Sequence, residues 1–147
     1  MIHFQRTLVI DAASDDIWAV LSRYMHIDEF APAITSVDAL TEAAIGVGAK
    51  RRNNFENGSS VVEEVIQWND GVGYRVQLSD MDAMPLKEAS SHIYLKPESS
   101  GTKVTWTFDY RMKFGPPGWL MGVTLLKMMM GKIIDANLKG LESKVKS

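Results

Sequence analysis

The stretch that decides the fold is TKVTWTFDYRM at residues 102–112, followed by KFGPPG at 113–118 and a mostly apolar run to Val145. From Val104 to Met112, apolar side chains alternate with polar ones, which is the period of a half-buried strand. After Gly118, apolar residues recur at the spacing of an amphipathic helix. We therefore expect a sheet with a broad aromatic face and a long terminal helix that lies across it.

The remainder of the chain predicts more strands than helices. Two short helices are expected after the first strand, at Ser14–Leu21 and at Ile27–Phe30. Strands are predicted at 2–11, 35–41, 47–56, 60–68, 72–80, 88–96 and 102–113. Consecutive strands joined by short turns pair antiparallel, whereas a parallel sheet needs a long crossover between strands. The prediction is one α+β domain over residues 1–147, in which a curved seven-stranded antiparallel sheet wraps around the C-terminal helix.

Composition narrows the classes of partner. The net charge is −2 and the chain has no basic run, which argues against nucleic acid and anionic membrane surfaces. The longest apolar tract, within 119–130, is interrupted by polar residues and is too short to span a bilayer. The first residues lack the apolar run of a signal peptide, so a cytoplasmic protein is expected. No cysteine is present and the three histidines lack ligand spacing, so neither a metal nor a cofactor is predicted.

Two turns predict the register of the central hairpins. Asn57-Gly58 is typical of a tight two-residue turn, which would set Arg51 opposite Glu64. Asn69-Asp70-Gly71 is typical of a three-residue loop, which would set Ile66 opposite Tyr74. Both turns predict the same inner face, made of Phe55, Val62, Ile66, Trp68, Tyr74, Val76 and Leu78.

The same register places Arg51 and Glu64 on the inner face as a cross-strand pair, with Asn53 nearby. A buried ion pair adds little to stability, because its desolvation offsets its attraction. Three interpretations remain open. The pair could form the polar end of a pocket that reads a ligand carboxyl, hydroxyl or carbonyl group. It could be a partly exposed structural pair. Alternatively, a slip of one residue would turn both side chains to solvent.

The C-terminal helix has one continuous apolar face. Helical spacing gathers Trp119, Val123, Leu126, Met130, Ile133, Ile134 and Leu141 on it. Asn137 falls in the middle of that face, where a buried amide must bond the sheet backbone or point into a cavity. Met121, Leu125 and Met128 form a second stripe on the solvent side. A homodimer contact is favoured for this stripe, and a pocket lip or the underside of a loop are the alternatives.

Methionine is concentrated along this helix and in the loop that contains Met81 and Met84. Its flexible side chain suits an adaptable pocket lid, although plain core filling accounts for the same clustering. Together with the inner face, these observations define a predicted ligand-binding set: Arg51, Glu64, Trp68, Tyr74, Met81, Met84, Trp106, Phe108, Tyr110, Met130, Ile133 and Asn137.

Catalytic signatures are sparse. The chain has no serine elbow and no cysteine nucleophile. Glu63 and Glu64 are adjacent on a strand, so they point to opposite faces and cannot act together as acid and base. If the chain catalyses a reaction, the inward groups available are Glu64, Tyr74, Tyr110 and Arg51. No catalytic residue is assigned on this basis.

The order of elements resembles a known superfamily. A strand, two helices, six strands and a long helix are similar to the helix-grip fold of the START-related, birch-pollen-allergen-like (SRPBCC) proteins, most closely their polyketide cyclase/dehydrase-like branch. The resemblance is carried by IDA at 10–12, IWAVL at 17–21, GVGAKR at 46–51, MPL at 84–86, GTKVTW at 101–106, GPPG at 115–118 and NLKGL at 137–141. It implies a cavity between the sheet and the final helix, with the loop at 80–87 near its mouth. It supplies no catalytic motif.

Three function classes follow. The favoured one is a carrier or sensor that binds an apolar or amphipathic small molecule, lipid-like or polyketide-like, in that cavity. A cyclase or aromatase-like enzyme would use the same cavity to fold a substrate, because orientation is a large part of such catalysis. A protein-interaction module would instead use the stripe of Met121, Leu125 and Met128.

Overall fold

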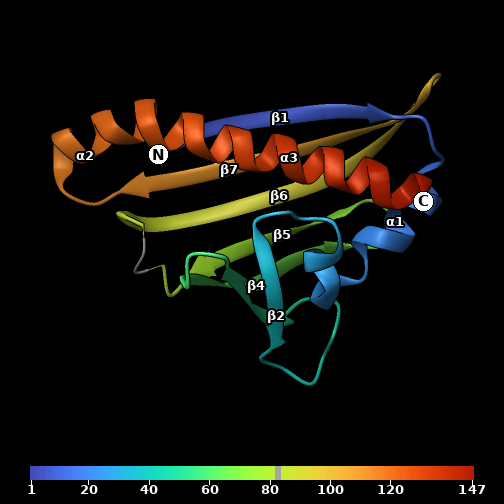
Figure 1. Ribbon diagram of the computed structural model, residues 1–147, viewed down its shortest axis with the longest axis horizontal. Helices are drawn as coiled ribbons and strands as arrows, with labels where there is room; N and C mark the ends of the chain where they lie inside the picture. The colour runs from blue at the N-terminus through green and yellow to red at the C-terminus, as the bar shows by residue number, and fades with distance from the viewer. Residues whose placement is uncertain (82–83) are drawn as a thin grey trace.

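The computed structural model describes residues 1–81 and 84–147 and contains one seven-stranded antiparallel sheet (Figure 1). The strand order is β1-β7-β6-β5-β4-β3-β2, so the first strand reaches the sheet edge beside the last. The strands are β1 (Ile2–Ile10), β2 (Ile34–Ala39), β3 (Lys50–Phe55), β4 (Ser60–Asn69), β5 (Gly73–Ser79), β6 (Leu86–Glu98) and β7 (Gly101–Met112). The α+β architecture predicted from the sequence is confirmed.

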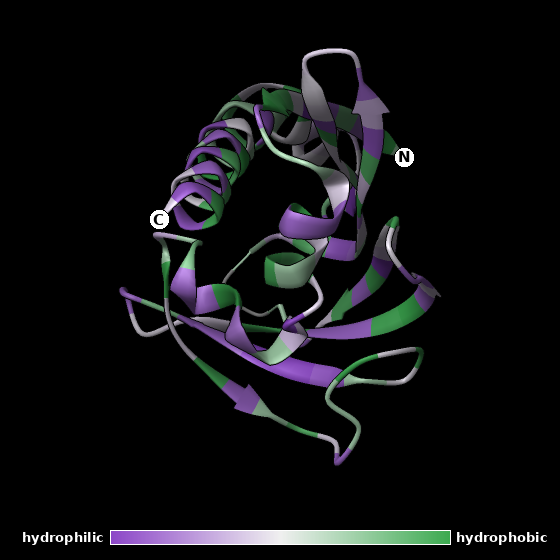
Figure 2. Cartoon of the chain, turned by 90° about the vertical axis from the view of Figure 1, so that its right-hand side faces the viewer, coloured by the Kyte–Doolittle hydropathy of each residue, from purple (hydrophilic) through white to green (hydrophobic). Residues whose placement is uncertain are grey.

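Helices cover the inner face of this sheet. The early helices are α1 (Ser14–Leu21) and η1 (Tyr24–Glu29), and the second is a 3₁₀ segment that begins before the predicted Ile27. The C-terminal helix consists of α2 (Gly115–Met121), a π segment η2 (Gly122–Leu126) and α3 (Lys127–Lys146). It runs along β1, β7 and β6 in Figure 1, and Figure 2 views it nearly end-on. Within the described ranges, no helix is long and apolar enough to cross a membrane.

Two contacts hold the C-terminal helix close to its neighbours. The Tyr110 hydroxyl of β7 donates to the carbonyl oxygen of Gly122, in the π segment. Near the other end, Gly140 faces the backbone carbonyl of Phe30, and a Cβ added at Gly140 would overlap that oxygen. The helix is therefore bonded to the sheet at its start and packed directly on the backbone after η1 at its end.

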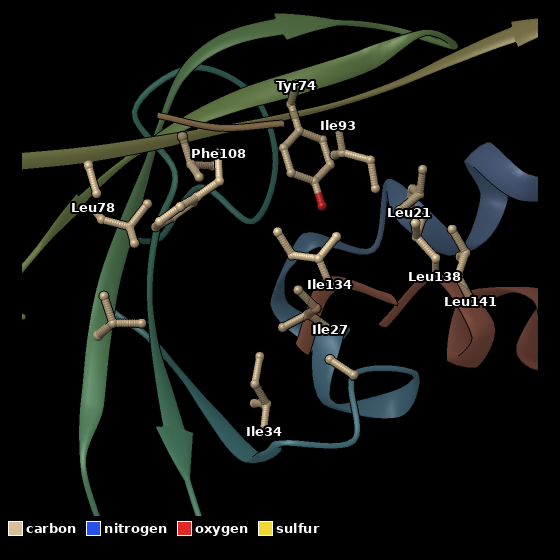
Figure 3. Packing of buried hydrophobic residues seen from close by; sticks show 14 of the residues in the cluster. Leu21, Ile27, Ile34, Tyr74, Leu78, Ile93, Phe108, Ile134, Leu138 and Leu141 are labelled. Carbon is tan, nitrogen blue, oxygen red and sulfur yellow. The ribbon is translucent and has the colours of Figure 1, made fainter. Parts of the chain in front are cut away.

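The core lies between the helix and the sheet (Figure 3). Ile134, Leu138 and Leu141 of α3 are buried, and so are the facing side chains of Tyr74, Ile93 and Phe108. The predicted helix face is right in its middle and C-terminal parts. It is wrong at Trp119, which is 56% exposed, because the helix has run past the rim of the sheet there.

The predicted register of β3 and β4 is wrong by one residue. The Phe55 N–H donates to the Ser59 carbonyl, so the loop holds three residues, 56–58, with Gly58 at φ +86°. A third loop residue shifts every partner, since the side-chain period is two. Arg51 consequently pairs with Glu63, and Glu64 turns to the outer face, where it meets Lys50 with Nζ···Oε1 at 3.4 Å.

The predicted register of β4 and β5 is also wrong. Trp68 pairs with Tyr74, and the pairing shifts again at a bulge between Val65 and Gln67. Val65 is fully buried, whereas Ile66, predicted to face inward, is 44% exposed. Val61, opposite Asn53, likewise takes the inner position predicted for Val62. The bulge returns Trp68 to the inner side, so the predicted face holds for Trp68 and Tyr74.

Candidate functional site

A cavity of about 550 Å³ lies between the inner face of the sheet and α3. This is within the range of small-molecule sites, which are roughly 300–1,000 Å³ and mostly apolar. Its walls come from η1, the strands β2 to β7, the connecting loops and α3. The predicted binding residues that line it are Met84, Trp106, Phe108, Met130, Ile133 and Asn137. Met84 belongs to the loop at 80–87, of which residues 82 and 83 lie outside the described part of the chain.

Three predicted aromatic residues lie beside the cavity and do not line it. Trp68 stacks on Tyr74, with ring centroids 5.3 Å apart and planes inclined by 10°. Trp18 of α1 packs edge-on against Trp68, with centroids 5.3 Å apart. Tyr110 is fully buried and bonds the helix as described above. These aromatic rings therefore pack behind the residues that line the cavity and do not contact its interior.

The predicted polar pair is corrected by the structure. Arg51 does face inward and is only 2% exposed, but it is not among the residues that line the cavity. Glu64 lies on the outer face with its side chain 44% exposed, so it is not a site residue. Met81 is half-buried against the core and is also absent from the lining. Glu63 lines the cavity in place of Glu64.

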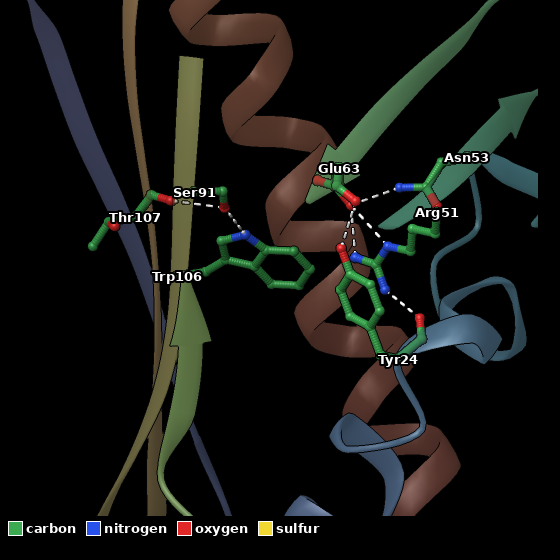
Figure 4. Close-up of polar contacts among 7 residues, drawn as sticks. All are labelled: Tyr24, Arg51, Asn53, Glu63, Ser91, Trp106 and Thr107. Atoms are coloured by element: carbon green, nitrogen blue, oxygen red, sulfur yellow. Dashed lines mark hydrogen bonds and ion pairs between the residues drawn. The ribbon is translucent and has the colours of Figure 1, made fainter. Parts of the chain in front are cut away.

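Glu63 is the centre of a buried polar cluster (Figure 4). Arg51 donates to its Oε1 from Nε at 3.0 Å and from Nη2 at 2.6 Å, and Asn53 Nδ2 donates to the same oxygen at 2.7 Å. Arg51 Nη1 donates to the backbone carbonyl of Tyr24, and the guanidinium carbon of Arg51 lies 3.8 Å from the centre of the Tyr24 ring. The Tyr24 hydroxyl donates to the backbone carbonyl of Glu63 at 2.9 Å.

Burial and the ion pair set the protonation of Arg51, Tyr24 and Tyr74. Burial alone would lower the pKa of Arg51, but attraction to Glu63 outweighs it and holds that pKa above its ordinary value. Burial raises the pKa of Tyr24 and of Tyr74, and the nearby Arg51 opposes this only in part. Arg51 is therefore a permanent cation, and both phenols keep their protons at neutral pH.

A second polar contact lies across the cavity from Glu63. Trp106 Nε1 donates to Ser91 Oγ at 2.7 Å, and Ser91 Oγ donates to the Thr107 carbonyl at 3.0 Å. Figure 4 shows this pair on the side opposite the Glu63 cluster. The indole nitrogen is thus satisfied within the sheet, and the Trp106 ring contributes an apolar surface to the cavity.

Two buried amide oxygens in the lining have no hydrogen-bond partner among the described residues. They are Oδ1 of Asn53 and Oδ1 of Asn137. Leaving a buried polar atom unpaired costs about 1–3 kcal/mol, so such atoms are rare in native proteins. The side-chain nitrogen of Asn53 still donates to Glu63, whereas no described hydrogen bond involves the side chain of Asn137. The prediction that Asn137 either bonds the sheet backbone or points into a cavity resolves to the cavity.

Sequence reasoning missed Glu63 and Ser91. Ser91 carries no signal beyond its inward parity on β6. Glu63 is the neighbour of Glu64, and a three-residue loop at 56–58, in place of the two-residue turn, would have predicted that Glu63 faces inward. The amide of Asn137 was found because a polar residue interrupts an apolar helix face.

Comparison with known proteins agrees with this geometry. Residues 1–146 match the family described as polyketide cyclase / dehydrase and lipid transport. The chain belongs to this family. The resemblance to the SRPBCC superfamily inferred from the sequence is thereby confirmed. No match was found among curated proteins.

Solved structures share the fold at low identity. An uncharacterized protein from Bacillus thuringiensis is 18% identical, with 99% of this chain and 100% of that one covered and a TM-score of 0.78. A norcoclaurine synthase point mutant from Thalictrum flavum is 17% identical, with 98% and 93% covered and a TM-score of 0.74. Major latex-like protein 151 from Panax ginseng is 15% identical, with 97% and 96% covered and a TM-score of 0.73. At such identities the likeness establishes the helix-grip fold alone.

Proposed function

We propose that this protein binds an apolar or amphipathic small molecule, lipid-like or polyketide-like, as a carrier or sensor. The observation that carries the proposal is the cavity of about 550 Å³, which combines apolar walls with a few inward polar groups. Such a combination is typical of a site that takes up an apolar body and orients one polar end. The family description, which includes lipid transport, supports the same class of ligand.

The first experiment is native mass spectrometry of gently purified protein, followed by solvent extraction of whatever is bound. A released apolar compound in near-stoichiometric amount is expected. The neutral fluorophore N-phenyl-1-naphthylamine is then added to protein from which the bound compound has been removed. Its binding would show that the empty cavity accepts an apolar molecule. Absence of both a bound compound and fluorophore binding would contradict the proposal.

A matched pair of helix variants locates the binding. Met130 lines the cavity, whereas Met128 on the same helix is 56% exposed and points away from it. Met130→Trp should fill part of the cavity and weaken fluorophore binding, while Met128→Trp should leave it unchanged. Equal binding by both variants would place the ligand elsewhere.

A second candidate function is a cyclase or aromatase-like reaction in the same cavity. The observation in its favour is the carboxylate of Glu63, which lines the cavity and has one oxygen free of protein hydrogen bonds among the described residues. A carboxylate in this position can transfer protons, and Glu63 replaces Glu64 among the inward groups that the sequence offered for catalysis. Turnover of a poly-β-carbonyl substrate that Glu63→Gln abolishes and Glu64→Gln retains would support this function.

The homodimer and the cytoplasmic location stay predictions. Leu125 and Met128 are 62% and 56% exposed, while Met121 is partly buried. Two apolar side chains that far exposed on one helix suit a contact with a second copy. Light scattering after chromatography should show a dimer that the double variant Leu125→Asp, Met128→Asp dissociates. A wild-type monomer at all concentrations would contradict it.

A further inference from the structure

The polar end of the cavity presents hydrogen-bond acceptors to a ligand, whereas the guanidinium of Arg51 lies behind these acceptors and outside the lining. Arg51 is 2% exposed and is not part of the lining, since Glu63 and the Tyr24 carbonyl take its described hydrogen bonds. What reaches the cavity is the side chain of Glu63, which is 13% exposed. A ligand therefore meets the acid of this ion pair and not the base.

The two oxygens of Glu63 differ in what they hold. Arg51 Nε, Arg51 Nη2 and Asn53 Nδ2 all donate to Oε1. Oε2 accepts no described hydrogen bond, although it is an acceptor of the same kind. The carboxylate thus has one saturated oxygen directed at the protein and one that is available as an acceptor for a ligand.

Asn137 supplies an independent second observation. Its side chain belongs to the cavity lining, the residue is 94% buried, and its Oδ1 has no partner among the described residues. An unbonded amide presents one acceptor and two donors. A hydroxyl group has one proton, which it can donate to Glu63 Oε2 or to Asn137 Oδ1, and its oxygen can accept from the amide nitrogen of Asn137.

We infer that the ligand has a neutral hydroxyl group, alcoholic or phenolic, at its polar end, and that Glu63 and Asn137 recognise it. This inference rests on the proposed binding function. A carboxylate would meet the Glu63 oxygen as a like charge, and the guanidinium of Arg51 already bonds Glu63 and the Tyr24 carbonyl. A protonated amine would add an uncompensated charge beside an ion pair that is already neutral in sum. A hydroxyl adds no charge.

The test compares three ligands with the same chain. Dodecanol, dodecyl methyl ether and dodecanoate compete with N-phenyl-1-naphthylamine for wild-type protein at about pH 8. We expect dodecanol to bind about tenfold more tightly than either of the others, which corresponds to about 1.4 kcal/mol. Dodecanoate binding as tightly as dodecanol, or the ether doing so, would overturn the inference and leave the proposed function standing. No binding of any ligand or of the fluorophore would overturn the proposed function itself.

Protein variants assign the preference to its residues. Glu63→Gln should narrow the tenfold advantage of dodecanol over dodecanoate, while Glu64→Gln, its neighbour on the outer face, should keep it. An unchanged preference in folded Glu63→Gln would overturn the role of Glu63. If Glu63→Gln fails to fold, the ligand series on wild-type protein still decides the inference.

Discussion

Replacing Asn137 with leucine should make the unliganded protein more stable. Asn137 lies on the buried face of α3, and no described hydrogen bond reaches its side chain. Leucine has the same number of non-hydrogen side-chain atoms, so it fits the same space without opening a new void. A polar-to-apolar change at a buried position usually destabilises a protein because it breaks hydrogen bonds. Among the described residues, the Asn137 side chain has no hydrogen bond to break.

The size of the gain follows from the unpaired amide. Removing a buried polar group that has no partner recovers about 1–3 kcal/mol of desolvation. Leucine also has a better helix propensity than asparagine, by a few tenths of a kcal/mol. We expect the free energy of unfolding to rise by about 1–3 kcal/mol, which for a chain of 147 residues raises Tm by roughly 2–4 °C per kcal/mol.

The assay is urea denaturation of protein from which any bound compound has been removed, monitored by circular dichroism. Asn53→Leu is the matched control. Asn53 also has an unpaired Oδ1, but its Nδ2 donates to Glu63 at 2.7 Å. Losing that bond to a carboxylate should lower stability by about 1.5–3 kcal/mol. The reasoning is refuted if Asn137→Leu destabilises the protein as Asn53→Leu does. The dodecanol preference should also shrink in Asn137→Leu, since the amide would no longer bind the hydroxyl.

Three further predictions test the packing and the titrating groups. Gly140→Ala should lower the free energy of unfolding, because the overlap of its Cβ with the carbonyl of Phe30 should outweigh the gain of about 1 kcal/mol in helix propensity. A variant that is more stable than the wild type by urea denaturation would show that the helix shifts freely. Burial raises the pKa of Tyr24 and Tyr74 above 10, so the unfolded state loses those protons first and stability should fall as pH rises past 10. A free energy of unfolding that stays constant above pH 10 would contradict this. Burial and a neighbouring guanidinium lower the pKa of His92 below 6.5, so its contribution to stability is full above 6.5 and is lost as pH falls below it. Wild-type protein should therefore lose more stability than His92→Gln between about pH 7.5 and about pH 5.5, and equal losses would refute the assignment.

The element order could be predicted from the sequence because each element has a clear period. The alternation through β7 and the helical spacing after Gly118 are strong signals that no tertiary contact had to override. The register of β4 could not be predicted from its pattern, because VVEEVI at 61–66 doubles each residue type. Both registers put a valine, a glutamate and an aliphatic residue on the inner face, so hydrophobicity does not choose between them.

Turn geometry decides what that doubled pattern leaves open. Gly58 and Gly71 both adopt positive φ, at +86° and +79°. Gly58 is the last residue of the loop 56–58, and Gly71 is the middle residue of the loop 70–72. A three-residue loop that ends on a left-handed glycine, as at 56–58, is a common hairpin connection. The choice between the two loops moves Glu63 inward and Glu64 outward, so one residue of loop length determines which carboxylate belongs to the site.

The residues that break local rules are those that make up the site. A core that served stability alone would place an apolar residue at position 137, and would pair both oxygens of Glu63 or neither. Instead, Arg51 bonds Oε1 of Glu63 and so stabilises a buried carboxylate next to an apolar cavity. The other oxygen, Oε2, has no described hydrogen bond. The ion pair adds little to the free energy of unfolding, because the desolvation of both charges offsets their attraction. Its effect is to hold a carboxylate oxygen at a fixed position beside the cavity, where it can accept the proton of a bound hydroxyl group.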